Sequence, residues 1–188
     1  MSRPYRVTVK EAINRTLIGE DHVSSQLILP PILPPDGMAN ILRRVRQGRG
    51  FKSDSDTLTR SNNGVETRVD PSSGRITIST SSSEQFSDED EGELPGCSPC
   101  AERARERLIE ALRTRLDKAA SLREIELQEE ATARLEQEVV AIGCEMEKAI
   151  HQTTAIALKK KAQEIGEIKK ITQDDQTGAM TIVVEVAA

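Results

Sequence analysis

One long segment free of proline decides how this chain folds. Residues 100–163 read CAERARERLIEALRTRLDKAASLREIELQEEATARLEQEVVAIGCEMEKAIHQTTAIALKKKAQ. Apolar residues recur in steps of three and four, the spacing that gathers side chains on one face of a helix. The segment therefore predicts an extended amphipathic helical region, and its apolar stripe is the predicted surface for protein contact.

The predicted partner contacts share the a and d spacing of a coiled coil, with polar interruptions. They are Leu112, Leu116, Ile125, Leu135, Val139, Ile142, Met146 and Ile156. An isolated helix would leave this stripe in water, so it must pair with itself as a helical hairpin, with a second copy, or with another protein. A rod and a helical hairpin both stay open, and two similar β-hairpins at its ends favour the folded-back form.

The N-terminal part predicts a small α+β domain over residues 1–80. Apolar and polar residues alternate from Tyr5 to Lys10, which is typical of a half-buried strand. Two further short strands, 13–18 and 23–29, would complete an antiparallel meander around turn residues 19–21. Prolines at 30–31 and 34–35 end the meander, and a short helix with Asp36 as N-cap then runs to Gly48.

The remaining segments predict two β-hairpins and a linker. Residues 65–69 and 75–80 flank a strong turn at 70–74 and form the first hairpin, while residues 166–188 form the second. Residues 81–98, rich in serine and acidic side chains, predict a disordered linker, and the helical region covers 99–165. The fold class is thus α+β, with a meander and hairpins around one long amphipathic helical region.

Composition excludes several classes of protein. A net charge of −5 and 2% aromatic residues argue against a nucleic-acid binder. The arginines of residues 43–49 and the lysines of 159–161 lack interleaved aromatics, so solvated helix surfaces explain them better. No apolar run approaches the roughly 18 residues of a membrane span, and the start lacks a signal-peptide core. We therefore expect a cytoplasmic protein with no membrane span.

The cysteines offer the only recognisable chemistry. Cys97 and Cys100 form a CxxC, which suits either a redox pair or half of a zinc site. Acidic neighbours would raise the thiol pKa, and the further ligand candidates are Cys144, His22 and His151. Cys144 and His151 are two helical turns apart, so reduced and unreactive cysteines are the favoured interpretation. With no catalytic triad or phosphate-binding glycine loop, we predict no enzyme, no cofactor and no metal.

Both ends of the chain resemble a known bacterial family. The opening Ser2-Arg3-Pro4-Tyr5-Arg6-Val7, the passage from Leu27 to Pro30 into a short helix, and the late stretches 165–168 and 181–182 carry the similarity. They resemble the FtsH ternary system domains, accessory proteins encoded beside an FtsH-like AAA+ ATPase and a von Willebrand A type protein in conflict systems. The acidic stretch and the CxxC depart from that resemblance.

The resemblance implies a non-catalytic adaptor or scaffold in a bacterial complex built around such an ATPase, and it brings no active-site residues. A homo-oligomeric coiled-coil protein is the main alternative from the residues themselves, since the stripe could also pair between copies. A redox or zinc-binding module using Cys97 and Cys100 is the third.

Overall fold

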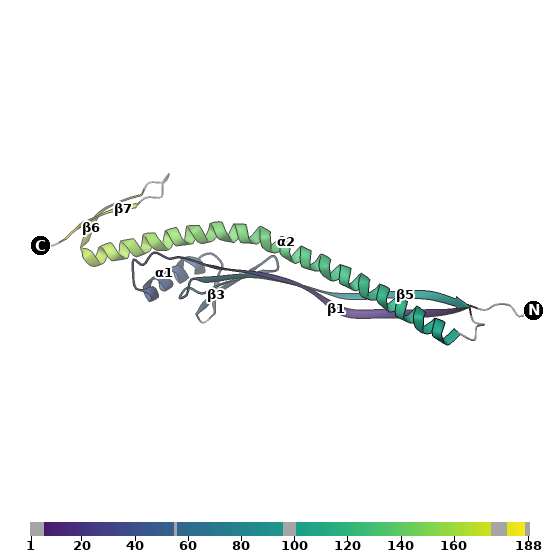
Figure 1. The fold of residues 1–188 in the computed structure, drawn as a ribbon. Coiled ribbons are helices and arrows are strands. Elements are labelled where there is room, and N and C mark those ends of the chain that lie inside the picture. The colour runs from purple at the N-terminus through teal and green to yellow at the C-terminus, as the bar shows by residue number, and fades with distance from the viewer. Residues whose placement is uncertain (1–5, 55, 96–100, 174–179, 187–188) are drawn as a thin grey trace, which may run out of the picture. The chain divides into compact units, whose positions relative to one another are not determined.

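The chain folds into two helices and seven strands in the described residues, 6–54, 56–95, 101–173 and 180–186 of a computed structural model (Figure 1). The predicted α+β class is confirmed. In chain order the elements are β1 Arg6–Gln26, α1 Pro35–Gln47, β2 Lys52–Asp54, β3 Thr57–Asn62, β4 Val65–Val69, β5 Arg75–Pro95, α2 Ala101–Ile165, β6 Glu167–Gln173 and β7 Met180–Glu185.

Five strands form one sheet in the order β1-β5-β4-β3-β2, and β6 and β7 form a separate two-stranded sheet. The predicted hairpin at 65–80 is present as β4 and β5. Its turn is held by the Asp70 carboxylate, which accepts hydrogen bonds from Ser72 and Ser73. These bonds lower the Asp70 pKa to about 2. A further tight turn at Asn63-Gly64, where both residues have positive φ, joins β3 to β4.

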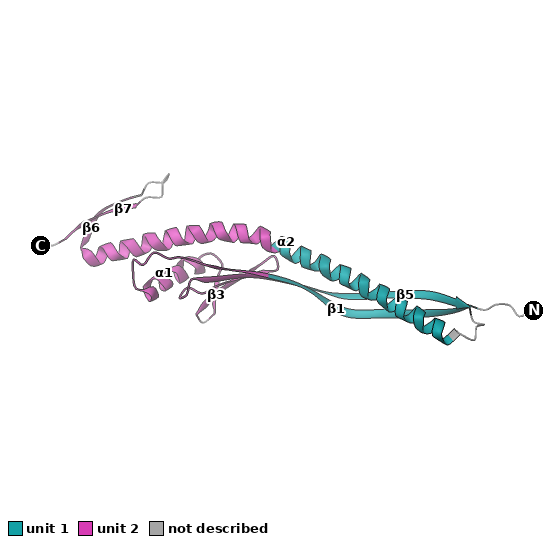
Figure 2. Ribbon diagram, in the orientation of Figure 1, with its two compact units in different colours: residues 1–21, 80–134 teal, residues 22–79, 135–188 magenta. Residues whose placement is uncertain are grey.

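Of the two forms left open for the helical region, the favoured helical hairpin was wrong, because α2 is one uninterrupted helix of 65 residues. The chain divides into two compact units, which Figure 2 shows in different colours, and α2 supplies residues to each. Unit 1 holds residues 1–21 and 80–134, and unit 2 holds residues 22–79 and 135–188. The stripe on α2 therefore pairs with strands of its own chain, which removes the need for a helical partner.

The predicted meander was also wrong, because β1 is one continuous strand and residues 19–21 form a docking point for α2 in unit 1. A Cβ on Gly19 would lie 2.5 Å from the backbone oxygen of Leu127, so only glycine fits here. The Gln128 side chain accepts a hydrogen bond from the Glu20 N–H and donates one to the Glu20 carbonyl. The polar and glycine residues that indicated a turn serve this contact instead.

The prediction of a disordered linker at 81–98 was wrong for residues 81–95, which continue β5 in unit 1. Phe86 packs beside the buried cluster of Leu17, Ala120 and Leu127, so the segment has an apolar anchor. Its carboxylates also find cations on β1 and α2. The ion pairs are Glu84 with Arg123, Asp90 with Arg115, Glu91 with Lys10 and Glu93 with Arg6. This pairing relieves the repulsion that an isolated acidic segment would suffer.

Unit 2 has the larger core. Side chains of the sheet and of α2 meet in one buried cluster of Phe51, Leu58, Val65, Val69, Ile76, Ile78, Leu135, Ile142 and Met146. Helix α1 packs its apolar face against Ala157 in a second cluster. It ends at Gly48 as predicted, but Asp36 lies in its first turn and Pro34 is the N-cap. None of the helices in the described ranges has an apolar stretch long enough to cross a membrane.

Candidate functional site

The structure gives most of the predicted partner contacts an internal role. Leu112, Leu116, Leu135, Ile142 and Met146 are buried, and Val139 packs against the core of unit 2. These residues face the sheet of their own chain, so they are not available as a seam for a partner. Ile125 and Ile156 remain open to solvent, with 55% and 45% of their surfaces exposed. Each of the two lines a hollow in its own unit.

The larger hollow is an apolar groove of about 790 Å³ in unit 2. The last third of α2 forms its floor through Ile150, Thr154, Ile156 and Leu158, together with His151, Gln152 and Ala155. Val45 of α1, Pro30 and Met180 of β7 complete it. Ile156 and Leu158 are exposed, so a large apolar area stays in contact with water. Exposed apolar areas of this kind are typical of contact sites.

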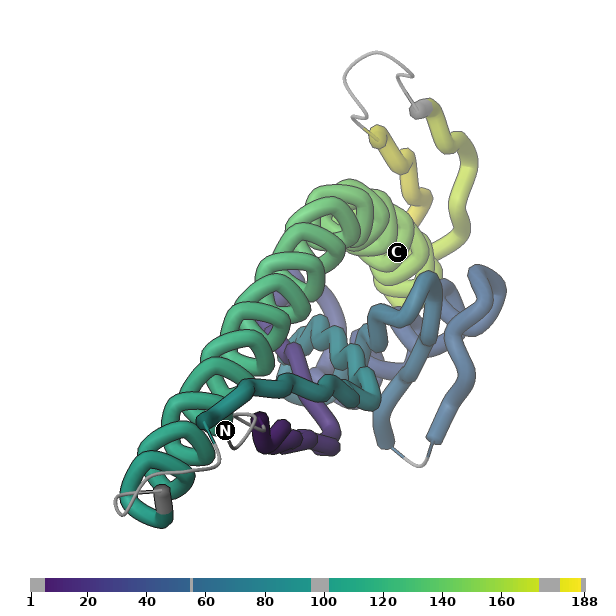
Figure 3. The backbone as a smooth tube through the Cα atoms, turned by 90° about the vertical axis from the view of Figure 1, so that its right-hand side faces the viewer, coloured from purple at the N-terminus to yellow at the C-terminus, as the bar shows by residue number. Residues whose placement is uncertain are grey.

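The β6–β7 hairpin follows the C-terminal end of α2 (Figure 3), and its residue Met180 lines the groove. Its register sets Ile168 opposite Val184 and Ile171 opposite Ile182, and opposite residues in an antiparallel pair share a face. Met180 lies on the same face by alternation. Ile171 is 40% exposed, and an isolated two-stranded sheet is marginally stable in water. The hairpin therefore offers an apolar face next to the groove.

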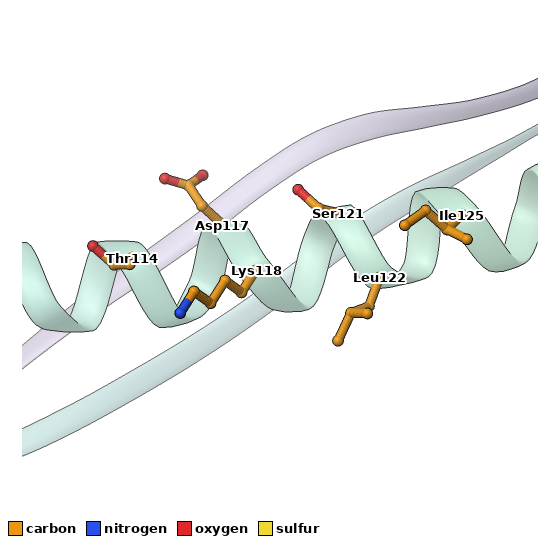
Figure 4. A pocket seen from close by; sticks show the side chains of 6 residues that line it. All are labelled: Thr114, Asp117, Lys118, Ser121, Leu122 and Ile125. Atoms are coloured by element: carbon orange, nitrogen blue, oxygen red, sulfur yellow. The ribbon is translucent and has the colours of Figure 1, made fainter.

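The smaller hollow, of about 440 Å³, lies in unit 1 and is lined by α2 alone. Figure 4 shows that its residues, among them Leu122 and Ile125, project from successive turns of the helix. Leu122 is 63% exposed. Because no second element among the lining residues supplies a wall, this is an apolar patch on a helix surface, and the groove of unit 2 is the better candidate site.

A buried ionic cluster holds α1 and β3 against α2 close to the groove. The Arg46 guanidinium has no exposed side-chain surface and donates to Glu145 Oε2 over 3.1 Å. Arg60 donates to the same oxygen over 2.9 Å. Both guanidiniums stack on the Phe51 ring, with centroid distances of 4.2 and 4.8 Å. The predicted solvated surface for arginines 43–49 was thus wrong for Arg46.

The pKa directions in this cluster follow from burial and charge. Burial lowers the pKa of Arg46, although the hydrogen bond that Arg46 donates to Glu145 acts in the opposite direction. Burial alone would raise the pKa of Glu145, but hydrogen bonds from Arg46 and Arg60 bring it below its ordinary value. The lowered pKa keeps the Glu145 carboxylate ionised at neutral pH. These ion pairs fix α1 against α2, and they thereby position Val45 of α1 at the side of the groove.

The cysteines and histidines do not gather in the described residues. Cys97 and Cys100 lie outside the described ranges, and Cys144 is exposed on α2. His151 lines the groove, whereas His22 lies on β1. Within the described ranges no group of three His, Cys, Asp or Glu side chains is placed to hold a metal ion. The sequence did not predict the groove or the ionic cluster of Arg46, Arg60 and Glu145, because each of them joins residues from separate elements.

Fold and groove together define an α+β protein with an apolar groove beside its C-terminal hairpin. The chain belongs to the FtsH ternary system domain X5 family, whose family model matches residues 1–186. The resemblance drawn from the two ends is thereby confirmed across essentially the whole chain. Neither a curated protein nor a solved structure matches the chain. The family places the chain in an FtsH ternary system, in agreement with an accessory subunit.

Proposed function

We propose that the chain is a non-catalytic adaptor or scaffold subunit of a complex built around an FtsH-like AAA+ ATPase. The observation that carries the proposal is the groove of unit 2, a hollow of about 790 Å³ where Ile156 and Leu158 of α2 stay exposed and Met180 of β7 is part of the lining. Membership of the FtsH ternary system domain X5 family supports an FtsH-like ATPase as the proposed partner.

The chemistry of the groove supports binding rather than catalysis. Its walls are mainly aliphatic, and its polar members, His151, Gln152 and Thr154, lie within about one turn of α2. Gln152 accepts a hydrogen bond from Arg49, which follows the C-cap residue of α1. A partner would therefore be held by apolar contact with a few polar anchors, as is usual in the centre of protein interfaces.

Co-purification with an FtsH-like ATPase from the same organism tests the proposal. The full chain is expected to form a complex with the ATPase, and Ile156→Asp is expected to weaken it by more than about tenfold, because a carboxylate would be buried in an apolar contact. Val140→Asp is the matched control. Val140 is 70% exposed on the same helix and does not line the groove.

Two outcomes would contradict the proposal. If the wild-type chain and the ATPase do not associate, the partner is wrong. If the two aspartate variants bind equally well while circular dichroism shows both to be folded, the groove is not the contact surface. Substrate delivery distinguishes an adaptor from a passive scaffold, since an adaptor changes the rate at which the ATPase processes a bound substrate protein.

A further inference from the structure

The outer edge of β1 is a long strand edge with unused hydrogen-bonding capacity. β1 is the last strand in the sheet order, and β5 is its neighbour in the described structure. Proteins usually protect such edges with proline, bulges, short strands or dense charge. Over 8–18, β1 has no proline, and alternate residues from Thr8 to Ile18 that face away from α2 include a single charge, Lys10.

The register shows which backbone groups point outward. Cross-strand contacts join Lys10 to Glu91, Thr16 to Gln85 and Ser24 to Thr77. In each of these pairs the two residue numbers add up to the same value. The same sum holds for Leu27 and Gly74, whose N–H and carbonyl oxygen form a backbone hydrogen bond. β1 therefore pairs with β5 in constant register, and its odd-numbered residues direct their N–H and C=O groups toward β5.

The even-numbered residues of β1 consequently direct their N–H and C=O groups to the free side. Glu20 provides independent support, because both of its backbone groups bond the Gln128 side chain instead of β5. Gln128 thus acts there as a substitute for a neighbouring strand and closes the free edge at that point. The open part runs over residues 8–18 in unit 1.

We propose that this edge pairs antiparallel with β1 of a second copy of the chain, around a two-fold axis at Ile13. Ala12 then exchanges hydrogen bonds with Asn14 of the second copy, and Lys10 does so with Thr16. The sheets of the two copies become continuous through unit 1. This inference is independent of the proposed function, which uses the groove of unit 2.

Charge complementarity selects this register and this occupant. With the axis at Ile13, Glu11 faces Arg15 of the second copy, and both residues lie within the open part of the edge. An axis at Glu11 would place two Glu11 side chains opposite each other, and an axis at Arg15 would do the same with two Arg15 side chains. Like charges directly opposite each other are destabilising. An axis one residue to either side of Ile13 sets Glu11 and Arg15 against apolar residues. The register at Ile13 thus brings the opposite-charge pair of Glu11 and Arg15 together, and the two-fold axis makes this pair occur twice.

The helices fit the same arrangement. A two-fold axis normal to the sheet sets both α2 helices on one face, and in unit 1 each α2 contacts both β1 and β5. Strands lie about 4.8 Å apart, so the two helix axes would be roughly 10 Å apart, close to the spacing of packed helices. Arg113 bonds Glu11, and Glu124 lies 3.9 Å from Arg15, so Arg113 of one copy approaches Glu124 of the other.

Sedimentation velocity on the full chain tests the dimer. The wild type is expected to dimerise, and Ala12→Pro is expected to weaken the dimer by about tenfold or more, since proline removes an outward N–H and leaves the bonds to β5 intact. Ser24→Pro is the matched control, because the Ser24 N–H also points outward but lies beyond residues 8–18. A monomeric wild type overturns the proposal, and so does equal weakening by both prolines or by neither.

Disulfide trapping tests the register without relying on the proline variants. In a chain with Cys97, Cys100 and Cys144 replaced by serine, Ile13→Cys is expected to give a covalent dimer on mild oxidation, because residue 13 faces its own copy at a distance that a disulfide can span. Val9→Cys faces Leu17 of the second copy and is expected to stay unlinked. Linkage at position 9 and not at 13 would overturn the proposed axis.

Discussion

Substitution of Gly19 by alanine is expected to destabilise unit 1. In an ordinary strand this change stabilises a protein slightly, because alanine restricts the unfolded chain. Here the new Cβ would lie 2.5 Å from the Leu127 oxygen, 2.6 Å from the Leu127 carbonyl carbon and 2.8 Å from the Gln128 nitrogen. All three are backbone atoms of α2, so no side chain can rotate away, and the helix itself must shift from β1.

The magnitude follows from two terms. Overpacking of a close contact costs about 1–3 kcal/mol. A shift of α2 would also stretch the two hydrogen bonds between Gln128 and Glu20, each of which contributes about 0.5–1.5 kcal/mol. We therefore expect Gly19→Ala to lower the free energy of unfolding by about 2–4 kcal/mol.

Urea unfolding followed by far-ultraviolet circular dichroism measures this change, since the chain has no tryptophan. Gly143→Ala is the control, because a Cβ there meets nothing within 4 Å and the residue lies inside α2. It should raise the free energy of unfolding by about 0.5–1 kcal/mol. A Gly19→Ala protein as stable as the wild type would refute the close contact between β1 and α2.

Three further predictions concern unit 2. Folding lowers the pKa of Asp70 to about 2, so the ionised carboxylate stabilises the folded state by about 1 kcal/mol after allowance for solvent. This stabilisation is present above about pH 4 and is lost as the pH falls toward 2. Urea unfolding of Asp70→Asn at a series of pH values should lack that decline. Glu145→Ala leaves the buried Arg46 charge unpaired and should cost about 2–4 kcal/mol in urea unfolding, whereas Glu147→Ala on the exposed face should change stability by less than about 0.5 kcal/mol. Phe51→Leu removes the ring between two guanidiniums and should lower the thermal midpoint; an unchanged midpoint would show that the stacking contributes nothing.

Local patterns in the sequence predicted local elements well. The turn at 70–74 and the stop at Gly48 depend on glycine and aspartate chemistry that acts within a few residues, and the structure has both. The long helix was also predicted, because its three-and-four spacing is sustained over many turns. The Asn63-Gly64 turn was a readable hairpin signal that the sequence reasoning passed over.

Long-range contacts explain the errors. Residues 19–21 have turn chemistry, but more than a hundred residues along the chain Leu127 and Gln128 convert it into a helix contact. The acidic stretch was predicted to be disordered because the cations that pair with its carboxylates, such as Arg115 and Arg123, lie on another element. The groove of unit 2 was out of reach for the same reason, since α1, α2 and β7 each supply only part of it.

The position of α2 in the chain has a consequence for how the protein is made. All five strands of the main sheet leave the ribosome before α2, which supplies Ala120 and Leu127 to one core and Leu135, Ile142 and Met146 to the other. At about 5–20 residues per second, translation of α2 takes about 3–13 s. Throughout that interval the apolar side chains of the nascent sheet are exposed to solvent, and the carboxylates of β5 lack the arginines of α2 with which they pair. Binding of a chaperone to this nascent sheet, or early joining of a second β1, would then protect the chain until its own helix arrives.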